Sequence, residues 1–117
     1  MTNIKIFKNK GDIYCVDCSG HTGYAEYGSD ILCSSISSIV QSAVIGVQEV
    51  AKLTIKLNIN EEKGKLKFKL NLKDRVGKKS NFDVSQYILK TMFLSLKNLA
   101  SNYANYMKLE VIEDDYD

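Results

Sequence analysis

The chain has one histidine, His21, and three cysteines, of which Cys33 follows the histidine after eleven intervening residues. A cysteine in the first turn of a helix lies beside unpaired backbone N–H groups and the positive end of the helix dipole, and both favour thiolate over thiol. A histidine within reach would pair with that thiolate and later protonate a leaving amine. The same N–H groups can act as an oxyanion hole. This pair therefore indicates nucleophilic thiol chemistry.

Asp30 and Ser37 fall on the same predicted helix face as Cys33, three residues before it and four after it. Asp30 fits two roles, since aspartate caps helix starts and a carboxylate can also orient a histidine; capping is favoured. Ser37 can hydrogen-bond near the thiol, but a small residue at a packed helix face is the simpler interpretation.

A zinc site is a competing interpretation. Cys15, Cys18, His21 and Cys33 form a Cys3His set that Zn²⁺ accepts. However, the first two cysteines fall on a predicted strand, where residues three apart face opposite sides. Burial of both as small apolar residues is therefore preferred. In the remaining alternative, Cys33 packs in the core and His21 is a solvated loop residue.

The hydrophobic pattern predicts the elements that must position these residues. Period-two alternation predicts strands over 3–9, 13–20, 53–60, 64–72 and 108–113. Helical periodicity predicts helices from Ser29 or Asp30 to Ala51 and over 82–107, the second with a capping box of Asp83 and Gln86. Residues 20–28, 61–64 and 73–81 are then loops and turns, and 114–117 a tail. One face of the second helix is predicted to carry Ile88, Met92, Leu96, Leu99, Tyr103 and Tyr106.

This order predicts an α+β fold, a ββαββαβ sandwich in which two helices pack on a mostly antiparallel sheet, on one face or on both. The length of 117 residues indicates a single domain, 1–117. Net charge is only +2 with Arg75 as the single arginine, so direct nucleic-acid binding is not expected. A non-enzymatic binding module using the lysine-rich hairpin 52–73 is the alternative from a different class.

No signal peptide and no membrane-spanning run is recognised, so a cytoplasmic protein with reduced thiols is expected. Neither a metal nor a cofactor is expected.

The stretch "GHTGYAEYGSDILCSSIS" resembles the signature of the ribosomal-processing cysteine proteases of bacteria, and the resemblance extends over essentially the whole chain. That signature has a Gly-His-Ala start, then Gly-x-Asp before the cysteine, and a serine four residues after it. Thr22 departs from it, standing where alanine is usual. The matching residues are Gly20, His21, Gly28, Asp30, Ile31, Leu32, Cys33 and Ser37.

The resemblance implies a cysteine endopeptidase that removes the N-terminal extension of a large-subunit ribosomal protein. It implies Cys33 as nucleophile, His21 as base, and Asp30 and Ser37 as supporting residues. It also implies a homodimer, and a mobile loop between histidine and cysteine that admits the substrate peptide. The loop residues assigned to substrate are Gly20, Thr22, Gly23, Tyr24, Tyr27 and Gly28; loop packing is an equal alternative for the two tyrosines.

Overall fold

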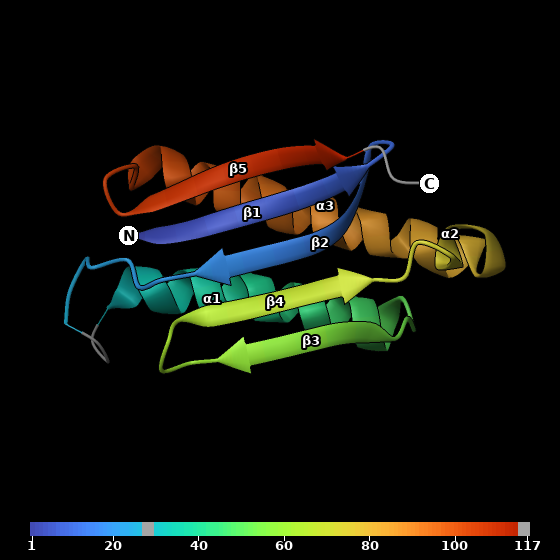
Figure 1. Ribbon diagram of the computed structural model, residues 1–117, viewed down its shortest axis with the longest axis horizontal. Coiled ribbons are helices and arrows are strands. Elements are labelled where there is room, and N and C mark those ends of the chain that lie inside the picture. Colours follow the sequence, from blue (N-terminus) through green and yellow to red (C-terminus); the bar gives the residue numbers. More distant parts are fainter. Residues whose placement is uncertain (27–29, 115–117) are drawn as a thin grey trace.

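The computed structural model describes residues 1–26 and 30–114 (Figure 1). Five strands and two long helices make up the fold, as the hydrophobic pattern predicts. The elements in chain order are β1 (Thr2–Asn9), β2 (Asp12–Ser19), α1 (Ile31–Ile45), η1 (Gly46–Val50), β3 (Ile55–Asn60), β4 (Lys65–Leu70), α2 (Asp74–Gly77), α3 (Lys79–Asn102) and β5 (Met107–Asp114).

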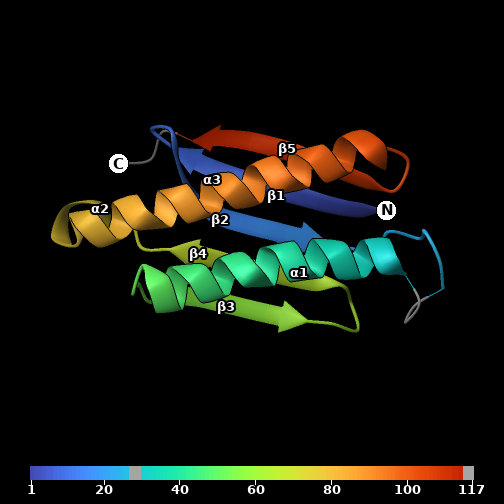
Figure 2. The same ribbon diagram turned by 180° about the vertical axis from the view of Figure 1, so that it is seen from behind.

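The strands form one sheet in the order β3-β4-β2-β1-β5. Three neighbouring pairs are antiparallel, and only β5 runs parallel to its neighbour β1. Both α1 and α3 lie on the same face of this sheet, behind it in Figure 1 and in front of it in Figure 2. The mostly antiparallel α+β sandwich is confirmed, and the helices cover one face rather than two.

The core lies between this sheet face and the two helices. Cross-strand register places Ile4 beside Cys18 and Cys18 beside Leu66, so one row of side chains runs under the helices. Helix α1 contributes Leu32, Ile36 and other buried residues at helical spacing. Burial of these apolar faces fixes which side of each helix meets the sheet.

The hairpin of β3 and β4 has the alternation that the sequence predicts. In β4, Leu66, Phe68 and Leu70 are buried and the intervening lysines are exposed. Strand β3 is an edge strand, and five of its six residues are exposed. The turn between them, Glu61–Gly64, lies at the end of the sheet where β2 leads into the loop before α1 (Figure 1).

The second long helix starts earlier than predicted. Helix α3 begins at Lys79 rather than at residue 82, and α2 occupies part of the predicted loop 73–81. The capping box is therefore wrong: Asp83 lies inside the helix and pairs with Lys79 at 3.1 Å. Gln86 instead donates to the backbone carbonyl of Ile13 and accepts from its N–H, at 2.9 and 2.8 Å. Gln86, which the local sequence assigns to a helix cap, thus forms a tertiary contact with β2 instead.

The same helix ends earlier than predicted, at Asn102 instead of residue 107. The chain then turns, and the N–H of Thr2 donates to the carbonyl of Tyr106 at 3.0 Å. This bond begins the parallel β1–β5 ladder, which pairs Thr2 with Met107. Tyr103 and Tyr106 therefore lie beyond the helix, on the turn into β5.

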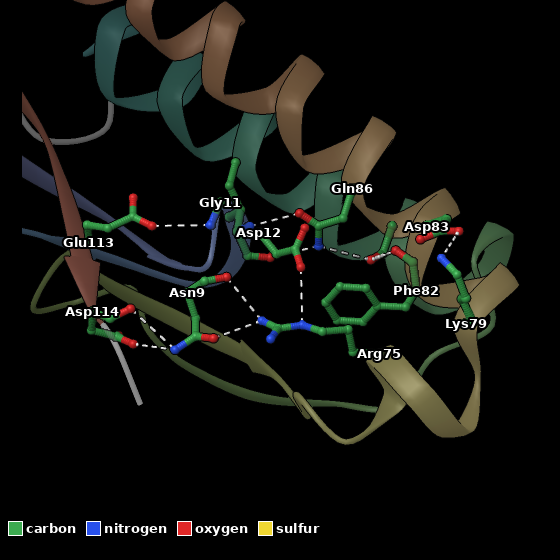
Figure 3. A network of polar contacts seen from close by, with 12 residues as sticks. Asn9, Gly11, Asp12, Arg75, Lys79, Phe82, Asp83, Gln86, Glu113 and Asp114 are labelled. Carbon is green, nitrogen blue, oxygen red and sulfur yellow. Dashed lines mark hydrogen bonds and ion pairs between the residues drawn. The ribbon is translucent and has the colours of Figure 1, made fainter. Parts of the chain in front are cut away.

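A polar network joins the β1–β2 turn, α2 and the end of β5 (Figure 3). It includes Asp12, the first residue of β2, whereas His21 follows the end of that strand. Asn9 is fully buried, and its side-chain and backbone oxygens both accept from Arg75 Nη2 at 3.0 Å. Arg75 Nε pairs with Asp12 at 3.1 Å, and Asn9 donates to Asp114 at 2.9 Å. The single arginine of the chain thus links α2 to the β1–β2 turn and to the end of β5.

Residues Ile31–Val50 form a helix long and apolar enough to cross a membrane by length and composition, with a mean hydropathy of 1.5. Serine and glutamine residues interrupt this segment, so it is not the unbroken apolar run that the sequence-based expectation excluded. Core helices of globular proteins share this property, and the sheet-facing residues of α1 are buried in the core.

Candidate active site

Cys33 lies in the first turn of α1, where the sequence predicts it. Asp30 is the N-cap residue, and its carboxylate accepts from the Cys33 N–H at 2.9 Å. Its backbone carbonyl accepts from the Ser34 N–H at 3.1 Å. The Cys33 N–H, one of the first-turn donors considered for an oxyanion hole, is therefore engaged by Asp30, whereas the Ser34 bond is the first regular helical hydrogen bond.

The loop before α1 folds back and brings His21 to this helix start. His21 Nδ1 lies 3.8 Å from Cys33 Sγ, within hydrogen-bond range for sulfur. His21 Nε2 lies 3.2 Å from the backbone carbonyl of Glu62, on the β3–β4 turn. The imidazole is thus placed between the thiol and a main-chain oxygen. Catalytic contacts are often long without substrate, so a separation of 3.8 Å is compatible with proton transfer.

Asp30 also holds the loop. Its carboxylate accepts from the hydroxyl of Thr22 and from the N–H groups of Tyr24 and Ala25, the latter two at 3.1 and 3.4 Å. Burial alone would raise the pKa of Asp30, but the bonds from Thr22, Cys33, Ala25 and Tyr24 outweigh it and hold the pKa below its ordinary value. These bonds are those of a helix cap that doubles as an anchor for the loop.

Tyr24 anchors the loop on its other side. Its ring meets Tyr103 and Tyr106 edge to face, with ring centroids 5.6 and 5.2 Å apart. Tyr24 is also 45% exposed, so it retains surface for a peptide. Gly23, its neighbour, adopts a positive φ with open space around it. Tyr27 and Gly28, also assigned to substrate by the resemblance, lie outside the described residues.

A cavity of about 80 Å³ opens beside Cys33. Ser37 lines it from α1, and its hydroxyl accepts from Gln41 at 2.7 Å. Gly20, Cys18 and Leu66 line it from the sheet side. The cavity is mostly apolar, so it suits a small uncharged group next to the thiol.

The other two cysteines lie on opposite faces of β2. Cys18 pairs with Leu66 under the helices, and burial raises its pKa to about 12. Cys15 pairs with Lys69 on the lysine-bearing face, and burial raises its pKa too. Both are therefore protonated at neutral pH. Among residues 1–26 and 30–114, no group of three or more His, Cys, Asp or Glu side chains is arranged to hold a metal ion.

Sequence reasoning did not find one contact of the site, between the backbone carbonyl of Glu62 and His21 Nε2. The two residues are 41 positions apart, and a backbone oxygen leaves no signature in residue type. The only local hint was the turn composition at 60–64, with Asn60 and Gly64.

Comparison with known proteins agrees with this geometry. A family model described as "Cysteine protease Prp" matches residues 1–108. Two curated relatives, both the ribosomal processing cysteine protease Prp of Staphylococcus aureus strains Mu50 and NCTC 8325, are 27% identical over 101 residues. That match covers 86% of this chain and 89% of each relative.

Solved structures show the same fold. An essential ribosomal processing protease Prp from S. aureus, crystallised with a covalently linked product peptide, is similar with a TM-score of 0.83 and 24% identity, over 95% of this chain and 99% of that one. SMU.848 from Streptococcus mutans is similar with a TM-score of 0.79 and 24% identity, over 97% and 96%. With residues 1–108 matched by the family model, this chain belongs to the cysteine protease Prp family and is a cysteine protease.

Proposed function

We propose that this enzyme removes the N-terminal extension of a large-subunit ribosomal protein, with Cys33 as nucleophile and His21 as general base. The observation that carries the proposal is the 3.8 Å approach of His21 Nδ1 to Cys33 Sγ at a helix start. The curated S. aureus relatives are named for ribosomal processing, and this supports the substrate class. Two S. aureus structures contain a substrate or product peptide, which supports a peptide ligand.

The chemistry follows from the geometry. The thiol proton passes from Cys33 Sγ to His21 Nδ1, and the thiolate attacks the carbonyl carbon of the scissile peptide bond. The imidazolium then gives that proton to the leaving amine, and a thioester remains on Cys33. Water, deprotonated by His21, hydrolyses the thioester and restores the thiol. Asp30 and Ser37 have supporting roles, Asp30 by capping α1 and Ser37 by lining the cavity beside the thiol.

The test is cleavage of a peptide that spans the extension and the first residues of the mature ribosomal protein. Wild type is expected to cut one bond, seen as two product masses. Cys33→Ala and His21→Ala should each lose at least about 10³-fold in rate. Cys15→Ala is the matched control, because it removes a buried thiol on the opposite face of β2 and should cut as wild type does.

Circular dichroism of each variant establishes that the fold is intact. Cleavage by Cys33→Ala at the wild-type rate would overturn the proposal. So would the absence of cleavage together with stoichiometric zinc binding, which would favour the Cys3His alternative.

The same proposal includes a homodimer, as the family resemblance implies, and a cytoplasmic location, as expected from the sequence pattern. Light scattering after size-exclusion chromatography at micromolar concentration measures the mass directly. A mass of one chain, 13.2 kDa, would contradict the dimer.

A further inference from the structure

The β3–β4 turn touches the imidazole of His21 from the side opposite Cys33. The carbonyl of Glu62 lies 3.2 Å from His21 Nε2. A carbonyl oxygen only accepts hydrogen bonds, so Nε2 must carry the proton in this contact. The neutral ring then has its lone pair on Nδ1, the nitrogen that lies 3.8 Å from Cys33 Sγ.

Gly64, at the end of the same turn, packs against the backbone that carries His21. It has a φ of +62°, the left-handed region that favours glycine. A Cβ at this position would lie 2.8 Å from the carbonyl oxygen of Gly20 and 3.1 Å from His21 Cε1. Both distances are shorter than an ordinary van der Waals contact. The turn can therefore approach the histidine only because residue 64 has no side chain.

Hydrogen bonds hold both the β3–β4 turn and the backbone at Gly20 in place. The Gly64 N–H donates to the Glu61 carbonyl at 3.0 Å, and the Lys63 N–H donates to Asn60 Oδ1 at 3.1 Å. On the other side, Thr2 Oγ1 donates to the Gly20 carbonyl at 3.1 Å. These bonds fix the β3–β4 turn that carries the Glu62 carbonyl, and they fix the backbone at Gly20, next to His21.

We propose that the β3–β4 turn is the orienting member of the catalytic set, with the Glu62 carbonyl fixing the His21 tautomer and Gly64 acting as the positioning residue. The inference rests on the proposed function, in which His21 takes the thiol proton at Nδ1. The carbonyl dipole also favours the imidazolium that forms on that transfer. A main-chain oxygen here does the work that a side-chain carboxylate or amide does in other Cys–His enzymes.

The first test is the ring tautomer, which can be read directly because His21 is the only histidine in the chain. With ¹⁵N-labelled wild-type protein at a pH where the ring is neutral, long-range ¹H–¹⁵N spectra distinguish the two tautomers. The Nε2–H form is expected to dominate. A dominant Nδ1–H form would overturn the proposal, and this measurement needs no variant and no substrate.

The second test compares Gly64→Ala with Gly11→Ala. Gly11 also has a positive φ, +84°, but a Cβ there meets nothing within 4 Å, so this control carries the backbone strain without the collision. The readout is the rate of Cys33 alkylation by iodoacetamide between pH 5 and 9, quantified on the Cys33 peptide by mass spectrometry. Glu61 and Lys65, the charged groups lining the cavity, are unchanged in both variants.

Gly64→Ala is expected to slow alkylation near neutral pH by at least about tenfold, and to shift the pH profile towards that of His21→Ala. Gly11→Ala should match wild type. With the ribosomal peptide, kcat should fall in Gly64→Ala while KM changes little. Alkylation of Gly64→Ala with the wild-type profile would overturn the proposal. If neither the wild type nor any variant cleaves the peptide, but the tautomer and the alkylation rates are as expected, the substrate assignment fails and the positioning role of the turn stands.

Discussion

The hydroxyl of Thr22 donates a hydrogen bond to the carboxylate of Asp30, eight residues along the chain, and both side chains are buried. The same carboxylate caps the helix that carries Cys33. The loop that bears His21 and the helix that bears Cys33 are therefore held by one anion. Any change at this contact should affect both the stability of the fold and the approach of base to nucleophile.

Replacement of Asp30 by alanine should destabilise the protein by about 1–2 kcal/mol, because α1 loses its cap and the loop loses its acceptor. Urea unfolding at pH 7 measures this. Asp83→Ala is the matched control, because it removes an exposed carboxylate that pairs with Lys79, and it should change stability by less than about 0.5 kcal/mol. Equal effects of the two substitutions would contradict the anchoring role of Asp30.

The contribution of Asp30 to stability should depend on pH in a defined direction. Its folded-state pKa is lowered from the ordinary 3.8, so its stabilisation is complete above that value and is lost as the pH falls through the lowered one. The difference in unfolding free energy between wild type and Asp30→Asn should be constant from pH 5 to 7 and shrink below pH 4. A difference that grows on acidification would show that the pKa is raised instead.

Thr22→Ala, which installs the residue usual in the family signature, should cost about 1 kcal/mol through loss of the hydroxyl donor. Hydrogen exchange at the amides of Tyr24 and Ala25 should accelerate, because both donate to the same carboxylate. Thr22→Ser retains the hydroxyl and should keep both amides protected. Unchanged exchange in Thr22→Ala would mean that the loop does not depend on this bond.

The ring contact between Tyr24 and Tyr106 should be measurable as a coupling of about 0.5–1.5 kcal/mol in a double-mutant cycle of alanine substitutions. Tyr24→Ala should also reduce the rate of Cys33 alkylation, because the loop that carries His21 loses one of its two anchors. Tyr87→Ala is the control, since that side chain is 76% exposed on α3. A coupling energy of zero would show that the contact with Tyr106 does not anchor the loop through Tyr24.

Arg75→Lys should destabilise the protein by about 1–3 kcal/mol without changing peptide cleavage at saturating substrate. Lysine keeps the charge, but its single nitrogen cannot reproduce both the two hydrogen bonds from Nη2 to Asn9 and the ion pair of Nε with Asp12. The network includes Asp12 at the start of β2 (Figure 3), whereas His21 follows the end of that strand. Thermal unfolding and kcat are the two readouts. A fall in kcat at a temperature where the variant is fully folded would show that the Arg75 network also affects the active site.

The strands and the two long helices were predictable because apolar residues on one face of an element recur with a period of two in strands and of 3.6 in helices. In β4, leucine and phenylalanine alternate with lysine, and only one register buries the apolar set. The start of α1 was predictable because Asp30 is a strong N-cap residue. The ends of α3 were not predictable. The turn after Asn102 is set by the pairing of β1 with β5, and the Gln86 side chain bonds to Ile13 of β2 instead of capping the helix start.

The sequence by itself determined that a histidine and a cysteine at a predicted helix start share one segment, since residue types and spacing around His21 and Cys33 are local properties. It also determined that Asp30 caps α1, because capping is a contact between near neighbours. Tertiary structure decided the rest: that Tyr24 packs on Tyr103 and Tyr106, and that the Glu62 carbonyl meets His21. Those contacts join segments about 40 or more residues apart, and a backbone carbonyl has the same chemistry at every position. Only the folded chain selects which one lies against the imidazole.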